Sequence, residues 1–244
     1  MVATDETIDR ATATVADIAL YFPQAIEVLN RYNLDYCCNG KKNFDDVCKQ
    51  HNLNPEQIWF ELLGTNVDSG TNNHMRFETW DLPLLIDFIL QNHHQYVRES
   101  IPKIRELLDK VCNVHGDEQP ELHKVRENFN SLAEELFAHM PKEEEILFPS
   151  INRIIQQNNG FIKSSTRLGN LNSPILVMEH EHETAGDLIK SIRSLTNGYT
   201  PPAFACPTYQ ITFKMLKEFD NDLMQHIHLE NNILFPKAKM LSVK

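Results

Sequence analysis

The sequence of 244 residues predicts an all-α protein, in which a small N-terminal helical domain precedes a four-helix bundle. Four long stretches carry apolar residues at helical spacing, joined by connections of the kind found in bundles. Glycine is scarce, and no stretch alternates apolar and polar residues for long enough to indicate a sheet. The pattern His-x-x-x-Glu-x-x-Ile-Leu-Phe-Pro occurs twice, at 139–149 and at 226–236, which indicates that a helix has been duplicated.

The N-terminal part, residues 14–63, predicts three short helices. The first covers "TVADIALYFPQAIEVLNRYN" and the second covers "NFDDVCKQHN". The third, "NPEQIWFELLG", begins with Asn54 as its cap and a proline at the first helical position. Residues 64–76 are rich in Gly, Asn, Ser and Thr and lack periodic apolar residues, which predicts a linker. We therefore expect one domain at 1–75, linker included, and a second domain at 76–244.

Four long helices are expected beyond this linker. The predicted ranges are 82–112, 119–156, 173–197 and 207–235, with a polar connection at 157–172. Pro149 and Pro236 end the repeated apolar tail and are expected to bend or stop the second and fourth helices. Each half of the bundle is predicted to be a helical hairpin, because a further histidine precedes each motif at nearly the same distance. These histidines are His94, 45 residues before His139, and His182, 44 residues before His226.

Charge and composition exclude several classes of protein. The formal net charge of −11 disfavours nucleic acid, because phosphate binding relies on clustered Lys and Arg. The longest apolar runs, such as "LPLLIDFIL", are far shorter than the roughly 20 residues needed to cross a bilayer. The N-terminus shows no basic segment followed by an apolar one, and 5 cysteines are too few for a disulfide scaffold. We therefore expect a cytoplasmic protein that binds neither nucleic acid nor membrane.

The two His-x-x-x-Glu motifs predict a metal site. Positions i and i+4 of a helix differ by about 40°, so His139 shares a face with Glu143, and His226 shares one with Glu230. One such motif alone usually means a solvated helix face, but two copies in matching phase favour metal binding. With one more histidine from each remaining helix, four imidazoles and two carboxylates suit iron or manganese better than calcium. Two carboxylates serving two metals would most economically bridge them.

Helical phase selects among the remaining histidines. In the third helix, His182 lies within the apolar stripe and His180 lies roughly opposite, which favours His182 as a ligand. In the first helix, His93 and His94 both flank the stripe, and phase does not separate them. A shift of 88 residues pairs His94 with His182, which matches the choice in the third helix.

Motifs along nearly the whole chain resemble the Repair of Iron Centres proteins, di-iron members of the hemerythrin-like superfamily with an N-terminal ScdA-type double-cysteine domain. These motifs are "LDYCCNGKK", "HHQYVRESIP", "HMPKEEEILFP", "VMEHEHETAG" and "HIHLENNILFP", in the expected order. Oxygen-carrying hemerythrins instead use five histidines, one Glu and one Asp, a pattern that the second His-x-x-x-Glu does not match. The connection at 157–172 looks longer than family members often show, which leaves its local geometry open.

The resemblance implies two non-haem iron ions per chain, bridged by carboxylates and, when oxidised, also by an oxo group. It makes the second histidine of "HHQYVR" the ligand, which favours His94 over His93. The six ligands that it implies are His94, His139, Glu143, His182, His226 and Glu230, with both glutamates bridging.

The cysteine pair Cys37 and Cys38 lies in "DYCCNGKK", at an expected helix end. Nearby Lys41 and Lys42 would lower a thiol pKa and favour the reactive thiolate. We expect redox or ligand-transfer chemistry, to which the family resemblance also points, against the alternative of two ordinary small residues in a turn. The other cysteines, expected to be buried small residues, are Cys48, Cys112 and Cys206.

The resemblance and the predicted site together favour a protein that repairs iron–sulfur clusters damaged by nitrosative or oxidative stress, by donating iron. Its partners would be damaged iron–sulfur proteins or a cluster scaffold, with nitric oxide or oxygen as small ligands. Two alternatives stay open: an enzyme that reduces nitric oxide to nitrous oxide with electrons from the cysteines, and a sensor or carrier of oxygen or nitric oxide. Glu135 and Glu181 are either a polar exit path for iron or solvent-facing acids. A monomer and a homodimer are both compatible with the sequence.

Overall fold

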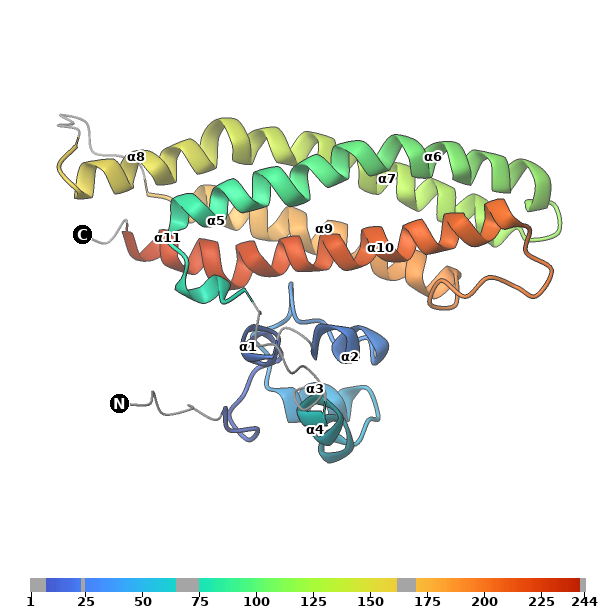
Figure 1. The fold of residues 1–244 in the computed structure, drawn as a ribbon, viewed down its shortest axis with the longest axis horizontal. Helices are drawn as coiled ribbons and strands as arrows, with labels where there is room; N and C mark the ends of the chain where they lie inside the picture. Colours follow the sequence, from blue (N-terminus) through green and yellow to red (C-terminus); the bar gives the residue numbers. More distant parts are fainter. Residues whose placement is uncertain (1–7, 23–24, 65–74, 162–169, 242–244) are drawn as a thin grey trace. The chain divides into compact units, whose positions relative to one another are not determined.

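The structure is a computed structural model that describes residues 8–22, 25–64, 75–161 and 170–241 (Figure 1). These residues form helices and connecting turns, with one isolated β-bridge between Thr14 and Asn43, so the predicted all-α class is confirmed. Within the described ranges, no helix has the length and apolar character that would let it cross a bilayer.

Two compact units divide the chain. The first unit runs to Trp80 and also takes in His228–Ile233, and the second unit holds the remaining residues. Inside the first unit, the side chains of His228 and Asn231 lie within hydrogen-bond distance of the carbonyl oxygens of Tyr36 and Cys37, at 3.2 and 3.3 Å.

The described residues of the N-terminal part, 8–22 and 25–64, form four short helices, not the three expected from the sequence. They are α1 (Val15–Tyr21), α2 (Ile26–Arg31), α3 (Phe44–Gln50) and α4 (Pro55–Gly64). The predicted first helix is split because Phe22, with φ −128° and ψ 72°, has left the helical conformation. Phe22 precedes Pro23, and the α-helical conformation is disfavoured for a residue that precedes proline.

Local capping explains where these short helices begin. Thr14 accepts from the backbone N–H of Asp17, whose carboxylate accepts in return from the Thr14 backbone N–H, which forms a capping box at α1. The predicted cap at Asn54 is confirmed, because its Oδ1 accepts from the Glu56 N–H at 2.9 Å. The expected linker at 64–76 falls mostly on residues 65–74, which lie outside the described residues.

Four helical rods make up the bundle, and three of them contain π-helical turns. The elements are α5 (Leu82–Phe88), a π segment (Ile89–His94) and α6 (Gln95–His115); α7 (Glu121–Lys142), a π segment (Glu143–Leu147) and α8 (Phe148–Asn158); α9 (Asn172–Leu195); and α10 (Pro207–Leu229), a π segment (Glu230–Leu234) and α11 (Phe235–Leu241). Their order and positions agree with the predicted helices, although the first and fourth rods extend three and six residues further. A short 3-10 turn, Phe77–Thr79, precedes them.

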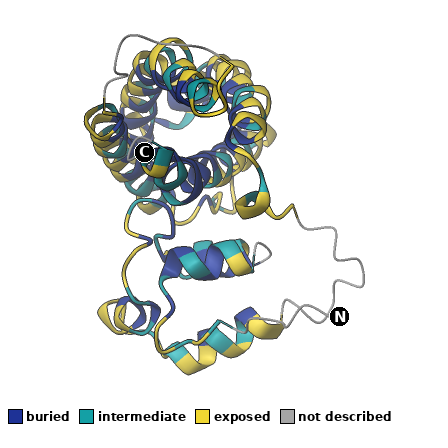
Figure 2. Ribbon diagram, turned by 90° about the vertical axis from the view of Figure 1, so that its left-hand side faces the viewer, coloured by how far each residue is buried: buried dark blue, intermediate teal, exposed yellow. Residues whose placement is uncertain are grey.

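The rods lie side by side (Figure 1), and their buried residues face the interior (dark blue in Figure 2). Pro149 and Pro236 do not stop the second and fourth rods. Each proline is the second residue of the α-helix that follows a π segment. In an α-helix the proline ring clashes with the carbonyl four residues earlier. For these prolines, the carbonyls are those of Glu145 and Asn232, which belong to the preceding π segments. Hydrogen bonding in a π segment is i→i+5, so the conflict is removed.

The turn between α9 and α10 is held by a buried ionic cluster. The guanidinium of Arg193 donates to both carboxylate oxygens of Asp220 at 2.7 Å, and the Tyr199 hydroxyl donates to the same carboxylate at 2.8 Å. Asp220 is 1% exposed. Tyr199 has a φ of +61°, so its backbone adopts the left-handed conformation that non-glycine residues seldom adopt. The cluster therefore compensates a strained turn.

We expect Asp220→Ala to lower the free energy of unfolding by about 3–5 kcal/mol, because it leaves the Arg193 guanidinium buried without its counter-ion. Denaturant titration of the metal-free protein measures this change. Glu106→Ala is the matched control, since the Lys110–Glu106 pair is exposed on both sides and should contribute less than about 1 kcal/mol. Equal effects of the two substitutions would show that the cluster is not a structural anchor.

Candidate metal centre

All six residues predicted to bind metal lie in the core of the bundle. His94 ends the first π segment, and Glu143 and Glu230 each begin a later one. The exposed fractions of the six are 0% for His94, Glu143 and Glu230, 1% for His226, 2% for His182 and 4% for His139. His180, in contrast, is exposed, as helical phase predicted. Burial of six polar side chains in one core is unfavourable unless they form hydrogen bonds with one another or bind a cation.

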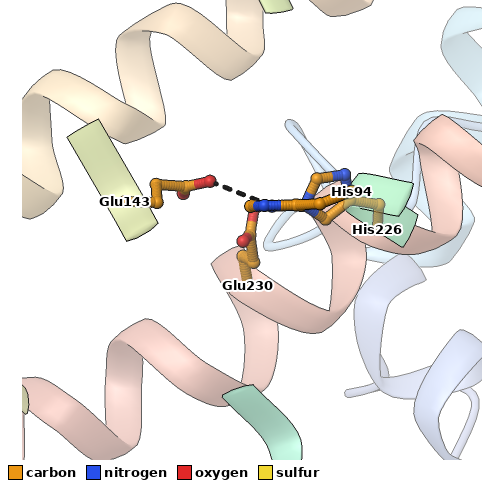
Figure 3. Close-up of side chains that lie close together, drawn as sticks. All are labelled: His94, Glu143, His226 and Glu230. Atoms are coloured by element: carbon orange, nitrogen blue, oxygen red, sulfur yellow. Dashed lines mark hydrogen bonds and ion pairs between the residues drawn. The ribbon is translucent and has the colours of Figure 1, made fainter. Parts of the chain in front are cut away.

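These six side chains form two overlapping groups. One group comprises His94, His226 and both glutamates, and the other comprises His139, His182 and the same two glutamates, Glu143 and Glu230. Within each group, the nitrogen and oxygen atoms that could bind metal lie within 4.8 Å of one another. Figure 3 shows Glu143 reaching from its own helix toward His94 and His226, with Glu230 beside them. The two glutamates are therefore common to both histidine pairs.

Distances between the inner atoms describe the centre more closely. The Nε2 atoms of His94 and His226 are 3.2 Å apart, and those of His139 and His182 are 3.1 Å apart. Glu143 Oε2 lies 3.4 Å from His94 Nε2 and 3.2 Å from His139 Nε2. One carboxylate oxygen thus lies between the two histidine pairs.

The donor set fits metal cations. Two nitrogens bound to one ion at about 2.0–2.1 Å, the bond length of imidazole on zinc, are separated by about 3 Å, as in both histidine pairs here. Two fully buried carboxylates side by side also favour the presence of positive charge. Imidazole and carboxylate together suit first-row metals such as iron and manganese, and differ from the all-oxygen shell of calcium.

Outer carboxylates orient one histidine of each pair. His94 Nδ1 lies 2.6 Å from Glu144 Oε1, and His139 Nδ1 lies 2.8 Å from Glu181 Oε2. A carboxylate only accepts hydrogen bonds, so Nδ1 carries the proton and Nε2 keeps a lone pair directed at the centre. Partial burial raises the pKa of Glu144, but hydrogen bonds from Arg98 and His94 outweigh it and hold the pKa below its usual value.

The pKa of Glu181 is also lowered, since hydrogen bonds from Lys142 and His139 outweigh the effect of its partial burial. Glu181 is therefore bound to a histidine of the centre, while Glu135 is exposed. The sequence did not indicate a role for Glu144. It adjoins Glu143 in a run of three glutamates, but the second motif has Asn231 at this position, so the repeat did not point to it.

His93 lies beside the centre but belongs to neither group. Its Nδ1 is 2.9 Å from Asp222 Oδ1, and its ring is parallel to the ring of His226, with 5.4 Å between centroids. Helical phase left His93 and His94 undecided because both are buried. The structure separates them by contact: His94 faces the glutamates, and His93 supports His226.

The cysteine pair occupies a tight turn in the first unit. The Sγ atoms of Cys37 and Cys38 are 3.3 Å apart, and Asp35 Oδ1 accepts from both of their backbone N–H groups. Asp35 completes a third group of close metal-type ligand atoms with the two cysteines. Burial, the hydrogen bond with Cys38 and the nearby Asp35 charge raise the pKa of the Cys37 thiol well above its usual value.

The predicted thiolate at Cys37 is therefore wrong. Lys41 and Lys42 are exposed, where water screens their charge, while Cys37 is 1% exposed. Burial likewise raises the pKa of Cys48 to about 11 and raises that of Cys112.

Cys206 differs from its expected role as a buried small residue. It is half-buried, immediately precedes α10, and its Sγ lies 3.4 Å from His115 Nε2. The hydrogen bond with His115 and backbone N–H groups at the start of α10 lower the pKa of its thiol. No repeat or motif marked this pair, because Cys206 and His115 are 91 residues apart.

We expect iodoacetamide at neutral pH to label Cys206 several-fold faster than Cys37, because Cys206 has the larger thiolate fraction. Peptide mass spectrometry at short reaction times measures the order. His115→Ala should slow labelling of Cys206, while His51→Ala, at an exposed histidine elsewhere, should not. Faster labelling of Cys37 would show that its turn opens readily in solution.

A helical bundle that buries two shared glutamates among four histidines defines a cation-binding bundle. The family model of the hemerythrin HHE cation binding domain matches residues 85–238. A second model, ScdA_N, described as a domain of unknown function (DUF542), matches residues 11–65. The chain belongs to the hemerythrin HHE cation-binding family.

Several relatives are similar over nearly their whole length. An iron-sulfur cluster repair protein YtfE of Edwardsiella ictaluri is 35% identical over 224 residues, covering 92% of this chain and 95% of the relative. A probable iron-sulfur cluster repair protein of Haemophilus influenzae is 36% identical, covering 93% and 97%. A YtfE protein of Yersinia pseudotuberculosis is 33% identical, covering 95% and 98%. The resemblance to repair proteins inferred from the sequence motifs is confirmed.

Proposed function

We propose that this chain is a di-iron protein that repairs damaged iron–sulfur clusters by donating iron. The observation that carries the proposal is the buried centre in which Glu143 and Glu230 are shared by two histidine pairs. The names of the relatives, which match more than nine-tenths of the chain, supply the class of target.

In this proposal His94 and His226 hold one iron, and His139 and His182 hold the other. The two shared glutamates bridge the irons, which the position of Glu143 Oε2 between the histidine pairs supports. The irons, when bound, would supply the metal that a damaged cluster has lost. Carboxylate side chains can change from two-metal to one-metal contact by rotation, so shared glutamates suit a site that must release its cargo.

The centre is enclosed by apolar side chains and by the outer carboxylates, which hold the histidine nitrogens toward the metal positions. This arrangement would keep bulk water away from stored iron, and we propose that half-buried Glu181 lies on the polar route by which iron leaves. Nitric oxide reduction is less favoured, because the relatives are named as repair proteins. Repeated turnover would also need a reductant for the iron, and Cys37 is buried with a raised thiol pKa.

We also propose that residues 1–75 and 76–244 are the two domains of the chain. The separate matches at 11–65 and 85–238 support a boundary between them. We propose damaged iron–sulfur proteins or a cluster scaffold as partners, and this proposal rests only on the repair role.

We expect the purified protein to bind about two irons, and Glu143→Ala Glu230→Ala to lose nearly all of this iron, because each glutamate serves both metal positions. Elemental analysis measures the iron content. His180→Ala, at the exposed histidine of α9, should keep full iron. Full iron in the double variant, or a single zinc in the native protein, would contradict the proposed centre.

Iron donation is tested with isotopically labelled iron. We load the full chain, mix it with an iron–sulfur enzyme inactivated by nitric oxide, and expect reactivation together with labelled iron in the repaired cluster. The glutamate double variant, supplied at the same concentration, should restore little activity. Reactivation without transfer of the label would exclude donation while leaving the iron centre itself intact.

A further inference from the structure

Two clusters of charged side chains, called clamps below, each bind one histidine of the centre from outside. The two clamps differ in geometry. In the first clamp, Glu144 receives His94 Nδ1 at 2.6 Å and Arg98 Nη2 at 2.7 and 2.8 Å to its two oxygens. His94 and Arg98 lie one helical turn apart on the first rod, while Glu144 comes from the second rod. The clamp therefore ties together the two rods that bring His94 and Glu143 to the centre.

The second clamp repeats this layout one rod further on. Glu181 of α9 receives His139 Nδ1 at 2.8 Å on Oε2 and Lys142 Nζ at 2.5 Å on Oε1. The lysine is a compact charge on a flexible stem that contacts one oxygen. The arginine is a planar, always-charged group that contacts both oxygens of its glutamate. Both cations have side chains that are 44% exposed, so the difference lies in geometry and not in burial.

The second histidines of the two pairs also differ in the ring on which they are stacked. His226, the partner of His94, is stacked on His93, whose Nδ1 is anchored by Asp222 at 2.9 Å. His182, the partner of His139, is stacked on the apolar ring of Phe235, with 5.8 Å between centroids. Polar groups thus restrain the His94–His226 pair from two sides.

We propose that Arg98 and Glu144 are positioning residues that make the His94–His226 pair the metal position that retains its ion more strongly. A histidine ligand leaves a metal by rotating its ring, and the Glu144 hydrogen bond opposes that rotation and increases the basicity of Nε2. Arg98 Nη2 contacts both oxygens of Glu144 and so limits the movement of this carboxylate. The ion at the His139–His182 pair is then the one released first.

This inference rests on the proposed iron centre and says which of its two positions serves as the store and which as the donor. The test measures iron extraction by an excess of a chelator from the fully loaded full chain. The native protein should release iron in two phases of equal amplitude, and Glu144→Ala should speed the slow phase by about 10–100-fold without changing the fast phase.

Three further variants distinguish a positioning role from general damage. Glu181→Ala should speed the fast phase only. Arg98→Lys should restore part of the retention lost in Arg98→Ala, because it keeps the charge but not the two-oxygen contact. Glu145→Gln, at the exposed glutamate next to Glu144, is the matched control and should leave both phases unchanged.

Mössbauer spectra of the fully loaded protein supply a second readout. We expect two iron environments, one altered by Glu144→Ala and the other by Glu181→Ala. Equal acceleration of both phases by Glu144→Ala, or no effect on either phase, would overturn the proposal. A native protein that does not hold two irons would instead overturn the proposed function, so the two failures are distinguishable.

Discussion

The burial of two carboxylates is the constraint on which the rest of the bundle depends. Glu143 and Glu230 are fully buried in a core that is built mostly from apolar side chains. An isolated carboxylate in such a core would take up a proton or be excluded. Four imidazole nitrogens face them instead, and outer carboxylates and surface cations follow, ending at Arg98 and Lys142. Polar or charged side chains of alternating kind therefore extend from the buried centre to the solvent.

Much of this arrangement is visible in the sequence because it is repeated. The two His-x-x-x-Glu motifs, each preceded by a histidine at nearly the same distance, place six polar residues on apolar faces, where a single motif would be ambiguous. Burial of His182 and exposure of His180 follow from helical periodicity alone. These properties depend on spacing along one helix, which is what a sequence records directly.

Features that depend on contacts between helices were not predictable in this way. Glu144 reaches a histidine on another rod, and the second copy of the motif has no acid in its place. Cys206 meets His115 only through the fold. Two lysines lie near Cys37 along the sequence, but burial dominates the pKa of its thiol and raises it. In each case the property depends on a residue distant in the sequence or on burial in the folded protein.

The π segments change how the rods can be altered. A π turn holds one more residue than an α turn, so each segment acts as a one-residue insertion that shifts the helical frame of everything after it by about 100°. Before Glu143, the inward stripe follows one frame. After it, Phe148 is buried, although at regular α-helical spacing it would lie about 140° from Glu143 and outside that stripe. Deleting one residue from 143–147 would remove the extra residue and give a more regular helix, with the segments before and after it in their present orientation. A substitution does not change the number of residues, so only a deletion removes the extra residue of the π segment. The second rod therefore cannot become a regular α-helix through successive substitutions.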